Sequence, residues 1–256
     1  MVEDLKNLFD GYSRQARLFP ALLTVFTPLV TALAWFPELV TSHIGSTLLT
    51  IATSCGLLYW LSSIARSRGK IVERRLLDEW GGWPTTYLLR HTSRLDEHTR
   101  RRYHQYLAAR LPDLQFPSHA DEKKNQVAAD AIYASAIKWL KEKVRKTAPL
   151  VDKENAQYGF RRNMRGMRTM GLWGALIAIV ASLVAIAAQI DVWPQAVADM
   201  KLFIAELRKA GNPAIWGALV IDILAVLAWT LVVNDEWVKG GAEQYAEALF
   251  ATCERS

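Results

Sequence analysis

The chain has 256 residues, of which 51% are hydrophobic, and a formal net charge of +6. This length suffices for one or two compact units. Its two cysteines, Cys55 and Cys253, exclude a disulfide framework and a cysteine-based zinc pattern. The alternative of a soluble helical protein with very apolar core helices is disfavoured, because polar positions would interrupt core helices as long as the uncharged windows found here.

Four apolar windows predict membrane-spanning helices, because a helix needs roughly 20 mostly apolar residues to cross a bilayer. We place these spans at about 18–36, 44–65, 170–191 and 214–233. Windows 18–37, 39–65 and 169–190 contain no Asp, Glu, Lys or Arg, and the fourth window is apolar except for Asp222. The N-terminal stretch carries mixed charges and lacks the features of a cleavable signal peptide.

The distribution of Lys and Arg predicts the orientation of the spans, because these residues mark cytoplasmic flanks. The link 37–43 has neither residue, whereas 66–75 and 161–168 are rich in arginine. We therefore expect a multi-pass protein of the bacterial inner membrane with both termini in the cytoplasm. The predicted organisation is 1–65 with spans one and two, 66–169 as a cytoplasmic region, 170–233 with spans three and four, and 234–256 as a cytoplasmic helix.

The region 66–169 holds the basic character of the chain. It has 23 Lys and Arg against 12 Asp and Glu, a net charge of +11. Helix-forming residues dominate it, and no strand is predicted. Expected helices cover 64–80, 96–111 and 121–146, and a further helix from about 151 continues into the third span. The fold class is thus an all-α integral membrane protein with a helical cytoplasmic region.

The stretch WGGWPTTYLLRH, residues 80–91, has two interpretations. Gly81 and Gly82 end one helix, and Pro84 suits the first position of the next, which is expected to reach Arg90. Backbone N–H groups at a helix start bind anions readily, so a phosphate-bearing ligand is one interpretation. The other is a plain joint between helices, with the arginines facing solvent or anionic lipid headgroups. The candidate ligand-binding residues are Thr85, Thr86, Arg90, His91, Arg94, Arg100, Arg101 and Arg102.

A second set of residues is a candidate for a pore or the membrane interface. Asp222 lies in the middle of the fourth span, where an acid is costly and is expected to face the bundle interior, water or another subunit. An arginine stripe at i, i+4 and i+7 precedes the third span. In an oligomer it could surround a pore mouth and favour anions, and lipid headgroups are the alternative partner. Structural packing is the alternative for the polar residues. The set comprises Asp222, Arg161, Arg165, Arg168, Thr50 and Ser54.

No catalytic or metal-binding motif is recognisable. His91, Asp96 and His98 are conceivable metal ligands, but they fit no zinc or iron pattern. A serine-hydrolase elbow, a phosphate-binding P-loop and a dinucleotide fingerprint are lacking in the sequence. We expect a protein that is not an enzyme and has no cofactor.

The order of two spans, a basic helical region and two further spans resembles small four-helix membrane effectors of bacterial anti-phage nucleotide-signalling systems, of CBASS type or Hailong type. This resemblance covers the whole chain at the level of architecture. The stretch WGGWPTTYLLRHTSRLDEHTRRRYH also resembles a family of little-characterised bacterial membrane proteins. The resemblance to the anti-phage effectors implies a homo-oligomer that forms a pore. A nucleotide or oligonucleotide, made by a cytoplasmic partner protein, would gate this pore.

Three functional classes therefore remain open. The first is an oligomeric, ligand-gated pore, and the second is a non-conducting anchor or scaffold that recruits a cytoplasmic partner. The third, a transporter, is disfavoured because four short spans without an inverted repeat offer little machinery. All three place the chain in a lipid bilayer.

Overall fold

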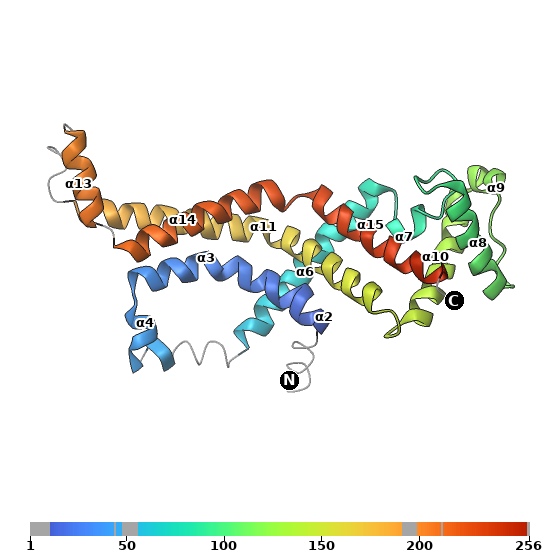
Figure 1. The fold of residues 1–256 in the computed structure, drawn as a ribbon, viewed down its shortest axis with the longest axis horizontal. Coiled ribbons are helices and arrows are strands. Elements are labelled where there is room, and N and C mark those ends of the chain that lie inside the picture. Colours follow the sequence, from blue (N-terminus) through green and yellow to red (C-terminus); the bar gives the residue numbers. More distant parts are fainter. Residues whose placement is uncertain (1–10, 44, 48–55, 191–198, 211, 255–256) are drawn as a thin grey trace. The chain divides into compact units, whose positions relative to one another are not determined.

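The computed structural model describes residues 11–43, 45–47, 56–190, 199–210 and 212–254, whose regular elements are helices with no strand among them (Figure 1). The predicted all-α class is confirmed for this part of the chain. The chain divides into two compact units. Unit 1 comprises 1–69 and 163–234, and unit 2 comprises 70–162 and 235–256.

Three helices of unit 1 are long and apolar enough to cross a membrane: Gly11–Trp35, Pro149–Ala187, of which the part from 163 belongs to this unit, and Pro213–Val232. The first consists of α2 (Gly11–Ser13), the π-helical η1 (Arg14–Leu18) and α3 (Phe19–Trp35), and it is followed by α4 (Glu38–Thr41). The second is α11 (Pro149–Ala187), and the third is α14 (Pro213–Leu227) with the π-helical η2 (Ala228–Val232). Three of the four predicted spans thus have a matching helix.

The predicted span 44–65 falls largely on residues outside the described part of the chain. Residues 44 and 48–55 belong to that remainder, and so do the candidate residues Thr50 and Ser54. The described helix α6 (Leu57–Trp80) ends at the residue where the predicted helix 64–80 was expected to end. The second span therefore stays a prediction.

The helices of unit 1 pack through small and polar residues. In Figure 1, α3, α11 and α14 run side by side, and the indole Nε1 of Trp35 donates to Ser182 Oγ of α11 at 3.1 Å. The backbones of α6 and α11 approach closely, because a Cβ added to Gly166 would lie 2.5 Å from the amide nitrogen of Gly69. Unit 1 also contains the amphipathic helix α13 (Met200–Ala210), whose Leu207 packs with the core around α14.

Unit 2 consists of α7 (Pro84–Tyr87), α8 (Glu97–Arg110), α9 (His119–Lys124), α10 (Gln126–Val144), α15 (Asp235–Ala251) and the short 3-10 helix η3 (Thr252–Glu254), with the adjoining parts of α6 and α11. Its main core combines side chains from several of these elements, among them Leu88, Tyr103, Tyr133 and Phe250. Tyr103 and Phe250 stack with ring centroids 5.4 Å apart. The C-terminal helix therefore completes the core of the basic region.

One predicted helix, 121–146, is wrong in its extent, because Asn125 divides it. Ser118 and Asp121 form a reciprocal capping box that starts α9 at His119, two residues before the predicted start. Asn125 has a non-helical backbone conformation, and its side chain accepts from the amide of Ala128, which starts α10 anew. By contrast, the predicted continuation from about 151 into the third span is confirmed, since α11 runs unbroken over 39 residues.

Candidate functional site

The glycines of the WGGWPTT stretch end α6 in a Schellman arrangement. The amide of Gly82 donates to the Leu77 carbonyl and that of Gly81 to the Asp78 carbonyl. Gly81 and Gly82 have φ of 72° and 121°, which a side chain would strain. The predicted ending of the helix at these residues is confirmed.

Pro84 begins α7 as predicted, but this helix ends at Tyr87 and does not reach Arg90. Thr85 and Thr86 are 2% and 7% exposed, so the two threonines belong to the packed part of unit 2. The predicted extent of this helix, to Arg90, is thus wrong. A single turn of this kind gives little room for an anion at its backbone.

Arg90 is engaged inside unit 2. Its guanidinium donates to both carboxylate oxygens of Asp130, at 2.8 and 2.7 Å, and to the Gly81 carbonyl at 2.6 Å. The two side chains of the pair are 15% and 26% exposed. This bidentate pair joins α10 to the turn after α6, so Arg90 has a structural role in this arrangement.

Two further candidate arginines pair with acids from the C-terminal part of the chain. Arg94 contacts Glu243 at 3.0 Å and Glu247 at 2.8 Å, and Arg102 contacts Glu254 at 2.9 Å. The sequence signal was available, since 235–254 is rich in acids and holds a single lysine. These counter-ions lie outside 66–169, so the net charge of +11 for that region does not include them.

The remaining members of the predicted cluster also have contacts within their own unit. Arg101 pairs with Glu97 one helical turn away at 2.8 Å, and Arg100 makes a long bond to the Leu95 carbonyl at 3.4 Å. The backbone amide of His91 donates to the buried carboxylate of Glu122, which also accepts from the hydroxyl of Tyr133 at 2.8 Å. The predicted arginines and His91 therefore have different partners in unit 2 and do not form one shared site.

The predicted arginine stripe of α11 has structural partners too. Arg161 in unit 2 donates to the Trp237 carbonyl at 3.2 Å and to Gln244 at 3.1 Å. Arg168 in unit 1 donates to the carbonyls of Trp229 and Thr230 in η2, at 2.9 and 3.2 Å. Arg165 likewise interacts within the chain. Arg168 thus satisfies carbonyls that the end of a helix leaves without an amide donor.

The polar seam of unit 1, which we define as Thr27, Thr31 and Asp222, consists of buried polar residues of α3 and α14. Asp222 is 0% exposed, and its Oδ2 accepts from the Thr31 hydroxyl at 2.7 Å. Its Oδ1 and the hydroxyl of Thr27 are buried without a hydrogen-bond partner among the residues that the structure describes. Thr24 instead donates to the Pro20 carbonyl in its own helix at 2.7 Å. Within a single chain, Asp222 therefore lies inside unit 1.

Unit 2 contains a hollow that sequence reasoning missed, which we call the Lys141 hollow. It has a volume of about 340 Å³ and lies between the WPTT turn and α10. Burial lowers the pKa of the Lys141 ammonium, while Glu73 opposes this shift from a distance. The lining residues are Trp83, Thr85, Thr86, Ala134, Ile137, Lys138, Lys141, Glu142 and Arg145. A lysine on a helix gives no sequence signal that distinguishes it from a solvent-exposed one.

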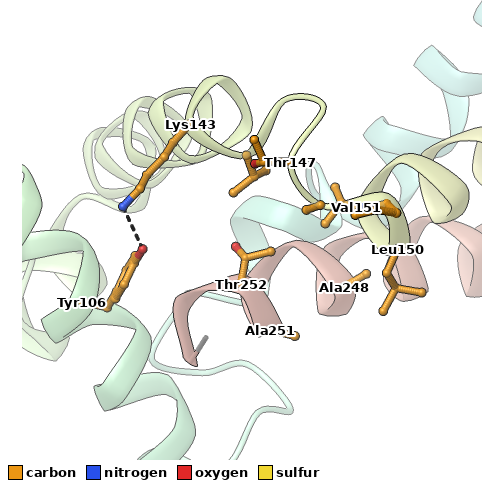
Figure 2. A pocket seen from close by; sticks show the side chains of 11 residues that line it. Tyr106, Lys143, Thr147, Leu150, Val151, Ala248, Ala251 and Thr252 are labelled. Carbon is orange, nitrogen blue, oxygen red and sulfur yellow. Dashed lines mark hydrogen bonds between the residues drawn. The ribbon is translucent and has the colours of Figure 1, made fainter. Parts of the chain in front are cut away.

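Another hollow, of about 230 Å³, opens between the end of α10, the start of α11 and the end of α15 (Figure 2). Its walls are mostly aliphatic, with Leu150, Val151 and Ala248 on one side. The Lys143 ammonium at its edge donates to the Tyr106 hydroxyl at 3.1 Å, as the dashed line in Figure 2 marks. Because this cation already has an acceptor, the Lys141 hollow is the better candidate for an anion.

Comparison with known proteins adds no relative. No protein-family model matches the chain, and no curated protein and no solved structure is significantly similar to it.

Proposed function

We propose that this chain is a bacterial membrane effector that conducts ions as a homo-oligomer when a nucleotide or oligonucleotide signal binds its basic helical region, as part of anti-phage defence. The observation that carries the proposal is the Asp222 carboxyl group, which is buried between apolar helices with one oxygen unsatisfied among the described residues. Ionisable residues inside a membrane are costly and commonly mark ion or proton pathways.

The burial of the seam supports an assembly of several copies. Asp222 is 0% exposed and α3 packs directly against α14, so the helices of one chain leave no open channel at this level within the described residues. Apolar side chains on the outer faces of α11 and α14, such as Ile177, Val180 and Leu224, are more than half exposed and fit lipid tails or neighbouring copies. Opening then requires a rearrangement that gives water access to Asp222.

We also propose the orientation with both termini and residues 66–169 in the cytoplasm, from the arginine asymmetry. A single cysteine placed at position 120, in a chain without its own cysteines, should resist an impermeant maleimide in intact cells and react after permeabilisation. Labelling in intact cells would contradict this orientation.

One observation favours a second function, that of a non-conducting anchor for a cytoplasmic partner. Arg90, Arg94 and Arg102 all pair with acids of their own unit, which leaves less positive charge for a ligand than the sequence suggests. A scaffold needs such internal order, whereas a signal receptor needs cations without counter-ions.

The two functions differ in one measurement, the membrane potential of bacterial cells that express the chain with and without its genomic neighbour. A potential-sensitive dye should report depolarisation when the wild-type chain and its genomic neighbour are expressed together. Asp222→Asn and Thr31→Val should each change the extent of this depolarisation. Thr24→Val is the matched control, because the Thr24 hydroxyl donates within its own helix. If wild type never depolarises the membrane, the anchor is favoured. If Asp222→Asn acts like wild type at equal membrane abundance, Asp222 has a packing role only.

A further inference from the structure

We infer that the Lys141 hollow binds a nucleoside phosphate, with the phosphate at Lys141 and the base on the ring of Trp83. This inference deepens the proposed function and rests on it, because it moves the ligand from the predicted arginines to Lys141 and Trp83, in a hollow that the predicted residues Thr85 and Thr86 also line. Binding at the hollow is measurable without any ion flux, so the inference and the pore proposal can fail separately.

Lys141 differs from the candidate arginines in its partners. Its ammonium lies 5.7 Å from the ring centroid of Trp83 and 5.4 Å from that of Tyr245. In the part of the chain that the structure describes, it has no hydrogen-bond acceptor and no ion pair within 4.0 Å. A desolvated cation is unfavourable, Glu73 offsets this cost only in part because the shift is still downward, and a bound anion would offset it further.

The other charges around the hollow also favour an anion. Lys138 and Arg145 join Lys141 in the lining, and Glu142 is its one acidic member. Because Arg145 pairs with Glu142 at 2.6 Å, Lys138 and Lys141 remain as the net positive charge. A neighbouring hollow of about 290 Å³ also includes Lys141, but Asp152 lines it, which disfavours a phosphate there.

Trp83 supplies a surface for a flat ring. Its side chain is 41% exposed and lines the hollow, and its indole is held edge-on to Tyr158 with centroids 6.5 Å apart. Stacking of a base on an aromatic side chain strengthens binding in a way that tolerates any base. A volume of about 340 Å³ lies at the lower end of the range of small-molecule sites. The cation and the exposed ring together match a nucleoside phosphate better than a simple anion.

Calorimetric titration of the detergent-solubilised full chain at low salt tests the inference, with ADP, inorganic phosphate and short-chain phosphatidic acid as probes. Wild type should bind ADP, and Lys141→Met should weaken this binding at least about tenfold. Lys143→Met is the matched control, because Lys143 lies on the same helix but bonds to Tyr106 outside the hollow. Trp83→Leu should weaken ADP while leaving inorganic phosphate unchanged.

Three results would overturn the inference: no ADP binding by wild type, equal ADP binding by Lys141→Met, or a preference for phosphatidic acid that Lys141→Met abolishes. The last result would identify a lipid-headgroup site instead. Circular dichroism of each variant must match wild type, and Lys141→Gln repeats the test if Lys141→Met does not fold. Loss of ADP binding in either folded variant, with Lys143→Met unaffected, supports the assignment.

Discussion

Replacing Arg90 by methionine tests whether this predicted ligand residue is a structural one. The substitution keeps the aliphatic stem but removes two bonds to Asp130 and one to the Gly81 carbonyl. Breaking a fully buried ion pair costs about 3–5 kcal/mol. Because the two side chains are 15% and 26% exposed, a discounted local loss of about 2–3 kcal/mol is expected.

Amide hydrogen exchange measures this local loss without requiring that the whole chain unfold in one step. Each 1.4 kcal/mol corresponds to about a factor of ten, so peptides covering α7 and α10 should exchange about 30- to 150-fold faster. Arg101→Met is the control, since the exposed Arg101–Glu97 pair contributes only about 0.3–0.5 kcal/mol. Equal protection in the two variants would refute the structural role of Arg90.

Two further predictions concern titratable groups of unit 2. Burial lowers the pKa of His104 below its ordinary 6.5, and His91 and Arg100 add to this shift while the Leu89 carbonyl and Glu122 oppose it. The unfolded chain therefore binds the proton more readily, so the free energy of unfolding falls as the pH falls through and below about 6.5. The thermal midpoint should drop between about pH 7.5 and 5.5. His104→Gln should reduce this drop. Burial also raises the pKa of the Cys253 thiol to about 11 from 9.0. In a Cys55→Ser background its thiolate fraction near pH 8 should be about 100-fold lower than in urea, and iodoacetamide labelling at equal rates in both states would contradict this.

Local sequence signals predicted several helix boundaries correctly. The pair Gly81–Gly82 ends α6, Pro84 begins α7, and Asp96 caps α8, because the Asp96 carboxylate accepts from the amide of Thr99 at 2.9 Å. These signals are local because capping and turn conformation depend on a few neighbouring residues. The division at Asn125 was missed, because the apolar spacing of α10 dominated the pattern and hid the capping box at Ser118.

Long-range pairing was beyond the sequence. The acids Glu243, Glu247 and Glu254 lie about 150 residues from the arginines that they neutralise, so charge counted along the chain overstated the free charge of the basic region. The polar seam shows the same limit. A costly acid at Asp222 was evident from its apolar surroundings, but its partner Thr31 is 191 residues away in sequence.

The π-helical segment η2 affects how the last apolar helix should be mapped by experiment. In Ala228–Val232 the amide of Val233 donates to the carbonyl of Ala228, five residues back, so this turn holds more residues than an α-helical turn. Each additional residue rotates the subsequent side chains by about 100° relative to a regular α-helical wheel. A cysteine-accessibility scan from Pro213 onwards should consequently show one periodicity up to Leu227 and a phase-shifted one beyond it. A single wheel drawn through both parts would assign lipid-facing positions to the wrong side.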